Sequence, residues 1–276
     1  MERRNFAQVL KDANIDIKRE HQRLYTMFYC HSSTNKYSFR DICEENFWKL
    51  PFTKTCLSLD DFDETHGFDY KYQPTNIDLE RLVSFCEYIY NIARYNCFEP
   101  WDTDGYDGYN GNDLIIQVNA VIELIGYMRE EQDGITIFVP KSQPAIVVSE
   151  MLPPDLSYKV IEYNHHSMKG DLARKQATLK LLADQLESKR TELKGLNKSL
   201  EDDIFYLVNN LNIRHNNIEA SSPKYKKSVA EMPKEELEEW YDKIYDMCLY
   251  AFMTLDQADR NAKVKELKSI IEGNKI

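Results

Sequence analysis

The chain has 276 residues, enough for two modest domains or one large helical domain, and its 9 glycines and 9 prolines are too few for a β protein with many tight turns. Its formal net charge of −11 argues against a dominant nucleic-acid-binding surface, although an acidic protein can carry a local basic patch. No apolar run approaches the roughly 20 residues that span a bilayer, and the charged N-terminal segment does not resemble a signal peptide. Composition therefore predicts a mostly α, cytoplasmic protein with at most a minor β element.

Residues 1–98 are predicted to form an N-terminal helical region. Apolar side chains recur at helical spacing over residues 5–30 and again over residues 79–93. Thr75 and Asn76 precede the second of these segments and are suitable helix caps.

Residues 99–112 are rich in glycine and in acidic or amide side chains, and they are predicted to link two halves of the chain. Five oxygen donors of the kind that calcium prefers lie in or next to this segment: Asp102, Asp104, Asp107, Asn110 and Asp113. The spacing does not match an EF-hand loop, because no glycine stands at the sixth place and no glutamate at the twelfth. A flexible acidic linker is the favoured interpretation, and a cation-sensing loop is the alternative.

Residues 113–276 are predicted to form a C-terminal helical domain. It opens with a helix at about 113–130, followed by a strand at 135–139, where a β-branched run stands between a glycine and a proline. Two short helices are expected near 143–151 and 157–164.

Leucines recur at intervals of seven along residues 171–210: Leu172, Leu179, Leu186, Leu193, Leu200 and Leu207. The adjoining d positions are only partly apolar, since Leu182 and Leu196 alternate with Lys175, Lys189 and Asp203. A full coiled coil needs apolar residues at both a and d. The pattern favours a long helix within an intramolecular bundle, and a homodimer seam through the 171–210 helix is the alternative.

Another helix is predicted to begin after Pro233. Proline at the first helical turn and the acidic pair Glu235 and Glu236 suit a helix N-terminus. The apolar stripe of this helix runs to Leu255, and residues 259–276 are predicted to be a charged tail.

The polar run at residues 209–217 follows the leucine heptads and is the strongest candidate site. Arg214 and His215 would lie near a helix C-terminus, where cations are favoured. These residues have the chemistry of a metal-independent RNA-cleaving site. Arg214 would bind a phosphate, His215 would move a proton, and Asn216 and Asn217 would hold a 2′-hydroxyl. Neighbouring phosphates could be held by three lysines: Lys224, Lys226 and Lys227. The plainer alternative is that Arg214 pairs with an acidic neighbour while the asparagines cap the helix end.

Other familiar chemical motifs are absent from the sequence. It contains no P-loop, GxGxxG loop, GxSxG elbow or papain-like cysteine motif. It has no CxxC, HxxxH or HExxH spacing, and its six cysteines are predicted to be reduced thiols. The sequence therefore predicts no cofactor and no metal.

The order of parts in residues 171–257 resembles the HEPN superfamily: a long helix, a polar Arg/Asn/His turn, a shorter connection and another amphipathic helix. Arg214 matches the signature arginine of that family, and Asn216 or Asn217 its polar companion. The positions of the signature histidine hold Glu219, Ala220 and Ser221, and the nearby histidine adjoins the arginine instead.

The resemblance implies a helical bundle that dimerises and cleaves RNA without a metal, as in bacterial toxin and abortive-infection systems. The first functional hypothesis is accordingly an RNA-directed, HEPN-like protein, with metal-independent endoribonuclease activity as its enzymatic form. The alternative is a non-catalytic helical scaffold or interaction module that uses the heptad leucines to bind itself or a partner helix. The expected partners are RNA and a second copy of the chain, and no membrane.

Overall fold

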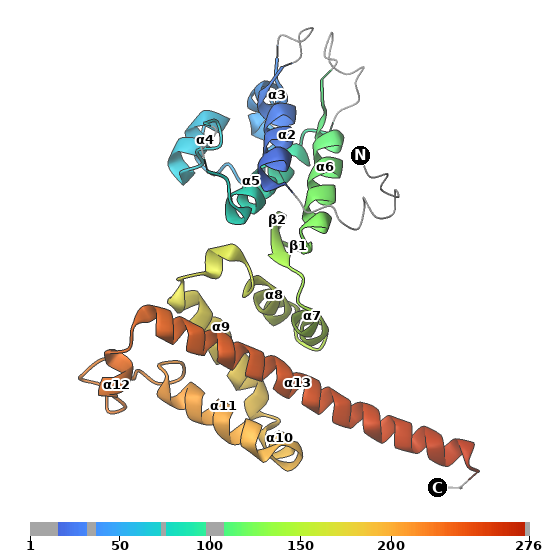
Figure 1. Ribbon diagram of the computed structural model, residues 1–276, viewed down its shortest axis with the longest axis vertical. Coiled ribbons are helices and arrows are strands. Elements are labelled where there is room, and N and C mark those ends of the chain that lie inside the picture. Colours follow the sequence, from blue (N-terminus) through green and yellow to red (C-terminus); the bar gives the residue numbers. More distant parts are fainter. Residues whose placement is uncertain (1–15, 32–36, 73–75, 98–107, 274–276) are drawn as a thin grey trace, which may run out of the picture. The chain divides into compact units, whose positions relative to one another are not determined.

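The computed structural model describes residues 16–31, 37–72, 76–97 and 108–273. It is mostly helical with one two-stranded sheet, which confirms the predicted fold class (Figure 1). The chain divides into two compact units, residues 1–138 and 139–276.

The elements of the N-terminal unit are the helices α2 (Ile17–Tyr29), α3 (Phe39–Glu45), η1 (Phe47–Lys49), α4 (Leu59–His66), α5 (Leu79–Ala93) and α6 (Gly111–Leu124), the strand β1 (Tyr127–Gln132) and most of the strand β2 (Ile135–Pro140), whose last two residues fall in the C-terminal unit. Helix α5 packs against both α2 and α6, and it buries side chains on most of its surface. Its N-cap is Asp78, whose carboxylate accepts a hydrogen bond from the backbone N–H of Arg81, so Asn76 does not serve as the cap. Thr75 lies outside the described residues.

The division between the units falls after Phe138, whereas the sequence predicted it at 99–112. Helix α6 belongs to the N-terminal unit because it packs directly on α5. Gly111 makes this contact close: a Cβ atom there would collide with the carbonyl groups of Ala93 and Asn96 at the end of α5.

Two of the five oxygen donors proposed for calcium cap helix α6. Asn110 and Asp113 form a capping box, in which each side chain accepts a hydrogen bond from the backbone N–H of the other residue. Asp102, Asp104 and Asp107 lie outside the described residues.

The predicted strand at 135–139 is confirmed as β2, and it pairs with β1. The prediction that α6 continues to residue 130 was wrong, since the helix ends at Leu124 and β1 follows. The two strands are joined by Asp133 and Gly134, whose φ angles of 52° and 78° are those of a two-residue hairpin turn.

The elements of the C-terminal unit are α7 (Gln143–Ser149), α8 (Pro154–Glu162), η3 (His166–Met168), α9 (Leu172–Glu187), α10 (Arg190–Leu196), α11 (Lys198–Asn210), α12 (Lys227–Ala230) and α13 (Lys234–Ile271). The long helix α13 packs against α7, α9, α10 and α11 (Figure 1). The helices predicted near 143–151 and 157–164 correspond to α7 and α8.

The heptad leucines do not form one long helix. The segment folds into α9, α10 and α11, with breaks at residues 188–189 and at Asn197, whose side chain caps α11 by accepting a hydrogen bond from the backbone N–H of Leu200. Four of the leucines are buried within the chain: Leu179, Leu186, Leu193 and Leu200. The intramolecular bundle is confirmed, whereas the prediction of one long helix was wrong.

The predicted charged tail is part of α13, which continues to Ile271. Its buried side chains end at Leu255, and Figure 1 shows the remaining turns extending beyond α10 and α11. Among the described residues, no helix is both long and apolar enough to cross a membrane.

Candidate functional site

The turn after α11 is closed by its backbone conformation. Asn212 adopts the left-handed region with φ of 58°, which asparagine tolerates better than most residues. The backbone N–H of Arg214 then returns to the carbonyl of Val208 at 3.0 Å. The chain therefore reverses direction immediately after α11, with a left-handed residue just past the helix end as in many helix C-termini.

Asn217 is fully buried and holds this turn together. Its side-chain oxygen accepts from the backbone N–H of Asn212 at 2.8 Å, and its own backbone N–H donates to the side chain of Asn212 at 3.0 Å. Its amide nitrogen donates to the carbonyl of Lys224 at 2.8 Å. All these bonds are internal, so Asn217 positions the turn and does not face a ligand.

Arg214 is held by acidic neighbours on α9. Its guanidinium forms ion pairs with Asp184, at 3.0 Å, and with Glu187, and donates to the carbonyl of Ala183 at 2.9 Å. It also lies 5.4 Å from the ring centroid of Phe205. The hydrogen bond from Arg214 lowers the pKa of the Glu187 carboxyl. The plainer sequence alternative predicted this ion-paired arrangement.

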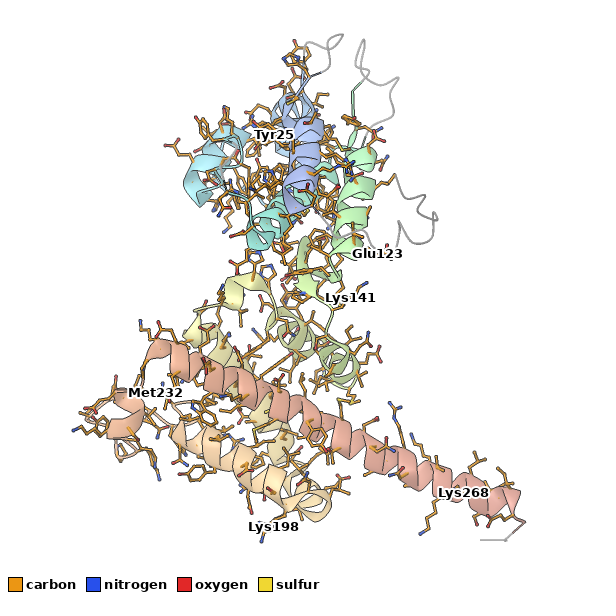
Figure 2. The ribbon with its side chains drawn as sticks, viewed as in Figure 1. Tyr25, Glu123, Lys141, Lys198, Met232 and Lys268 are labelled. Carbon is orange, nitrogen blue, oxygen red and sulfur yellow. The ribbon has the colours of Figure 1, made fainter. Side chains whose placement is uncertain are left out.

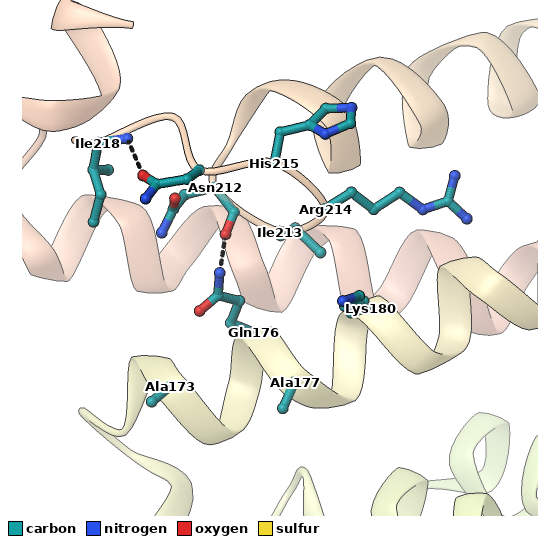
Figure 3. Close-up of a pocket in the computed structure, with 10 residues that line it drawn as sticks. Ala173, Gln176, Ala177, Lys180, Asn212, Ile213, Arg214, His215 and Ile218 are labelled. Atoms are coloured by element: carbon teal, nitrogen blue, oxygen red, sulfur yellow. Dashed lines mark hydrogen bonds between the residues drawn. The ribbon is translucent and has the colours of Figure 1, made fainter. Parts of the chain in front are cut away.

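Asn216 and His215 have different surroundings. The side-chain oxygen of Asn216 accepts from the backbone N–H of Glu219 at 3.0 Å, while its amide donates to the Glu219 carboxylate at 2.7 Å. The His215 side chain is exposed, and Figure 3 shows it leaving the turn in a different direction from Arg214. The two residues are adjacent in sequence, but their functional groups are not brought together.

An open pocket of about 430 Å³ lies between α9 and the turn (Figure 3). It is lined by Ala173, Gln176, Ala177, Lys180, Asn212, Ile213, Arg214, His215, Asn216 and Ile218. None of these ten residues is acidic, in a chain whose net charge is −11. Gln176 donates a hydrogen bond across the pocket to the carbonyl of Asn212, so α9 is tied to the turn.

The lysines expected beside the turn lie outside this lining. The backbone carbonyl of Lys224 and the backbone N–H of Lys226 both bond to Asn217, the latter at 2.8 Å. The ammonium of Lys227 lies 3.7 Å from a Glu231 carboxylate oxygen. Lys224 and Lys227 are exposed, and Lys226 is half-buried.

Sequence reasoning missed the α9 side of the pocket. Ala173, Gln176, Ala177 and Lys180 follow the i, i+3, i+4, i+7 spacing that places residues on one face of a helix. Two alanines four residues apart leave room on a helix surface. This pattern, on the face away from the leucine row, was the available signal.

Lys180 and His215 are the pocket groups best able to meet a ligand. Lys180 is exposed, and no described residue forms an ion pair with it. With one histidine and no carboxylate or thiolate, the lining is unlike a divalent metal site. Lys180 and the amides of the lining suit a polar anionic ligand, whereas the charge of Arg214 is already matched by Asp184 and Glu187.

No family model, curated protein or solved structure matches the chain, so the HEPN resemblance of residues 171–257 stays a prediction.

Proposed function

We propose that the pocket between α9 and the 211–218 turn binds single-stranded RNA. The observation that carries the proposal is the lining: two cationic side chains, one imidazole and three amides beside four apolar residues, with no acidic residue, on a strongly acidic chain. Single-stranded RNA presents phosphates to cations and unstacked bases to amides and flat rings. The RNA-directed function implied by the HEPN resemblance is of this kind.

The residues of the pocket and of the turn have different roles in this proposal. Lys180 contacts a phosphate, and the exposed His215 ring contacts a base or sugar. Arg214 neutralises Asp184 and Glu187, which would otherwise repel a phosphate near the pocket. Asn217 keeps the turn closed.

The enzymatic form of the proposal adds metal-independent cleavage of the bound RNA. His215 is the group in the pocket suited to general acid–base work, because histidine is the side chain that most often transfers protons in enzyme sites and this ring is exposed beside the pocket. Arg214 is then a positioning residue that fixes the backbone on which His215 stands.

Fluorescence anisotropy of a labelled single-stranded RNA pool, in EDTA at low salt, tests the binding. Lys180→Glu should weaken binding by about tenfold or more, because it reverses the charge that meets the phosphate. Lys198→Glu makes the same change on an exposed lysine of α11 outside the pocket and should leave binding close to wild type. Equal effects of the two variants, or no binding by the folded wild type, would refute the proposal.

The same RNA, recovered after incubation and separated by length, tests cleavage. Shortened products from the wild type that disappear with His215→Ala, while binding persists, support the ribonuclease form. Intact RNA in both samples leaves the protein an RNA-binding module.

A further inference from the structure

The C-terminal end of α13 carries an exposed apolar stripe. The exposed fractions of its members are 56% for Tyr250, 36% for Met253, 48% for Val264, 55% for Leu267 and 73% for Ile271. Figure 2 shows the last turns of α13, around Lys268, standing clear of the other helices of the C-terminal unit.

The spacing of the stripe is that of a coiled-coil seam. Tyr250, Val264 and Ile271 fall on one heptad row, with Gln257 between the first two. A second row holds Met253, Arg260 and Leu267. A helix that displays both rows to solvent over three turns or more exposes the surface that a partner helix covers in a coiled coil.

We propose that this face pairs with the same face of a second copy of the chain, the two α13 helices running antiparallel. The proposal does not depend on RNA binding at the pocket, and it uses neither the heptad leucines of α9 to α11 nor the turn.

Charge disfavours the parallel arrangement. Parallel pairing in register would set Arg260 against Arg260 of the second copy in the centre of the seam. It would also bring Lys263 beside Lys268 of the second copy at the flanking positions. Like charges at these places disfavour the pair.

One antiparallel register avoids these clashes. In this register three pairs of residues meet in the seam, the second of each pair from the second copy: Tyr250 with Leu267, Met253 with Val264, and Gln257 with Arg260. Each pair occurs twice by symmetry. The four apolar layers then flank a polar centre, and Ile271 lies outside them, level with Asp246 of the second copy.

The flanking charges are complementary in this register. Asp256 faces Lys263 of the second copy, again twice by symmetry. Asp256 already lies 2.5 Å from Arg260 on its own helix, so it would sit between two cations. A shift of one heptad toward the C-terminus would instead bring the two copies of Lys263 together.

Analytical ultracentrifugation of the full chain over a wide concentration range tests the pairing. The wild type should associate to a dimer, and Leu267→Glu should remain monomeric because it places a carboxylate in an apolar layer. Lys265→Glu changes charge on the opposite side of α13 and should dimerise normally. A monomeric wild type, or dimerisation that Leu267→Glu leaves unchanged, would overturn the proposal.

Charge exchange tests the antiparallel register. Asp256→Lys and Lys263→Asp should each weaken dimerisation about fivefold, and the double variant should recover most of the loss. In a parallel pair these residues do not meet, so failure of the double variant to recover contradicts the register. RNA binding measured on the same samples separates the two proposals: a monomer that binds RNA overturns only the pairing.

Discussion

The ammonium of Lys175 lies 2.7 Å from a carboxylate oxygen of Asp242, and this contact joins α9 to α13 across a largely apolar interface. The Lys175 side chain is only 7% exposed. It also lies 2.8 Å from the carboxylate of Glu238, and 5.4 Å from the centroid of the Tyr163 ring. The hydroxyl of Tyr163 in turn donates to Asp242 at 3.0 Å, which brings α8 into the same polar cluster.

Lys175→Met should destabilise the C-terminal unit by about 2 kcal/mol, because it removes the cation that compensates two carboxylates and keeps only the apolar stem. Urea denaturation followed by circular dichroism measures the change. Lys198→Met, on an exposed lysine of α11, is the matched control and should shift the midpoint little. An unchanged midpoint for Lys175→Met would show that solvent, rather than Lys175, stabilises the carboxylates.

Asn217→Ala should destabilise the turn by about 2–3 kcal/mol, since it leaves the backbone N–H of Asn212 and the carbonyl of Lys224 without their buried partner. Hydrogen exchange should show faster exchange of the Asn212 amide. Asn216→Ala alters an exposed side chain of the same turn and should have the smaller effect. Equal stability losses in the two variants would contradict the central role given to Asn217.

Substitutions around Arg214 test whether its side chain neutralises Asp184 and Glu187 or contacts an RNA phosphate directly. Arg214→Ala should weaken RNA binding, because Asp184 and Glu187 are left uncompensated beside the pocket. Adding Asp184→Asn and Glu187→Gln to that variant should restore binding by about tenfold if Arg214 acts through those carboxylates. Anisotropy with the same RNA pool measures both. A triple variant that binds as weakly as Arg214→Ala would indicate direct contact between Arg214 and the RNA.

The sequence predicted the helices better than it predicted their ends. Apolar periodicity identified α5 and the start of α13, because each buries a continuous face. It did not reveal the break at residues 188–189, since the leucine spacing continues across it without glycine or proline. Gly195, which can break or kink a helix, stands two residues before the second break at Asn197. The hairpin signal was present in Asp133 and Gly134, and it would have shortened the helix predicted to reach residue 130.

The sequence predicted the turn of the candidate site but not the residues that α9 contributes to it. The polar turn stands out in the sequence, and its position after a helix follows from local pattern. The α9 contribution, Gln176 and Lys180, depends on which face of α9 packs beside the turn. Likewise, Lys175 interrupts the apolar d row visibly, but its partners Glu238 and Asp242 lie more than 60 residues away in the chain.

The N-terminal unit should show an acid-sensitive stability that originates at His21. This side chain is 1% exposed, its ring packs 4.7 Å from that of Phe85, and neither ring nitrogen has a hydrogen-bond partner among the described residues. Burial, with a smaller contribution from Arg81, lowers the pKa of His21 from 6.5 to about 4. The folded unit therefore holds the histidine neutral, while the unfolded chain binds a proton below about pH 6.5.

Because the pKa of His21 is lowered in the folded state, the free energy of unfolding falls as the pH drops from 6.5 toward 4, by about 3 kcal/mol in all. His21→Phe should remove this loss, because the ring stays in the aromatic cluster without a titrating group.

Asp63 acts in the opposite direction. Burial raises the pKa of its carboxyl to about 6, so the stability that it contributes to the folded unit grows as the pH falls from about 6 toward 3.8. Asp63→Asn should therefore make the acid loss steeper. Urea midpoints measured from pH 7 to pH 4 test both signs, and a His21→Phe profile as steep as that of wild type would place the acid-sensitive group elsewhere.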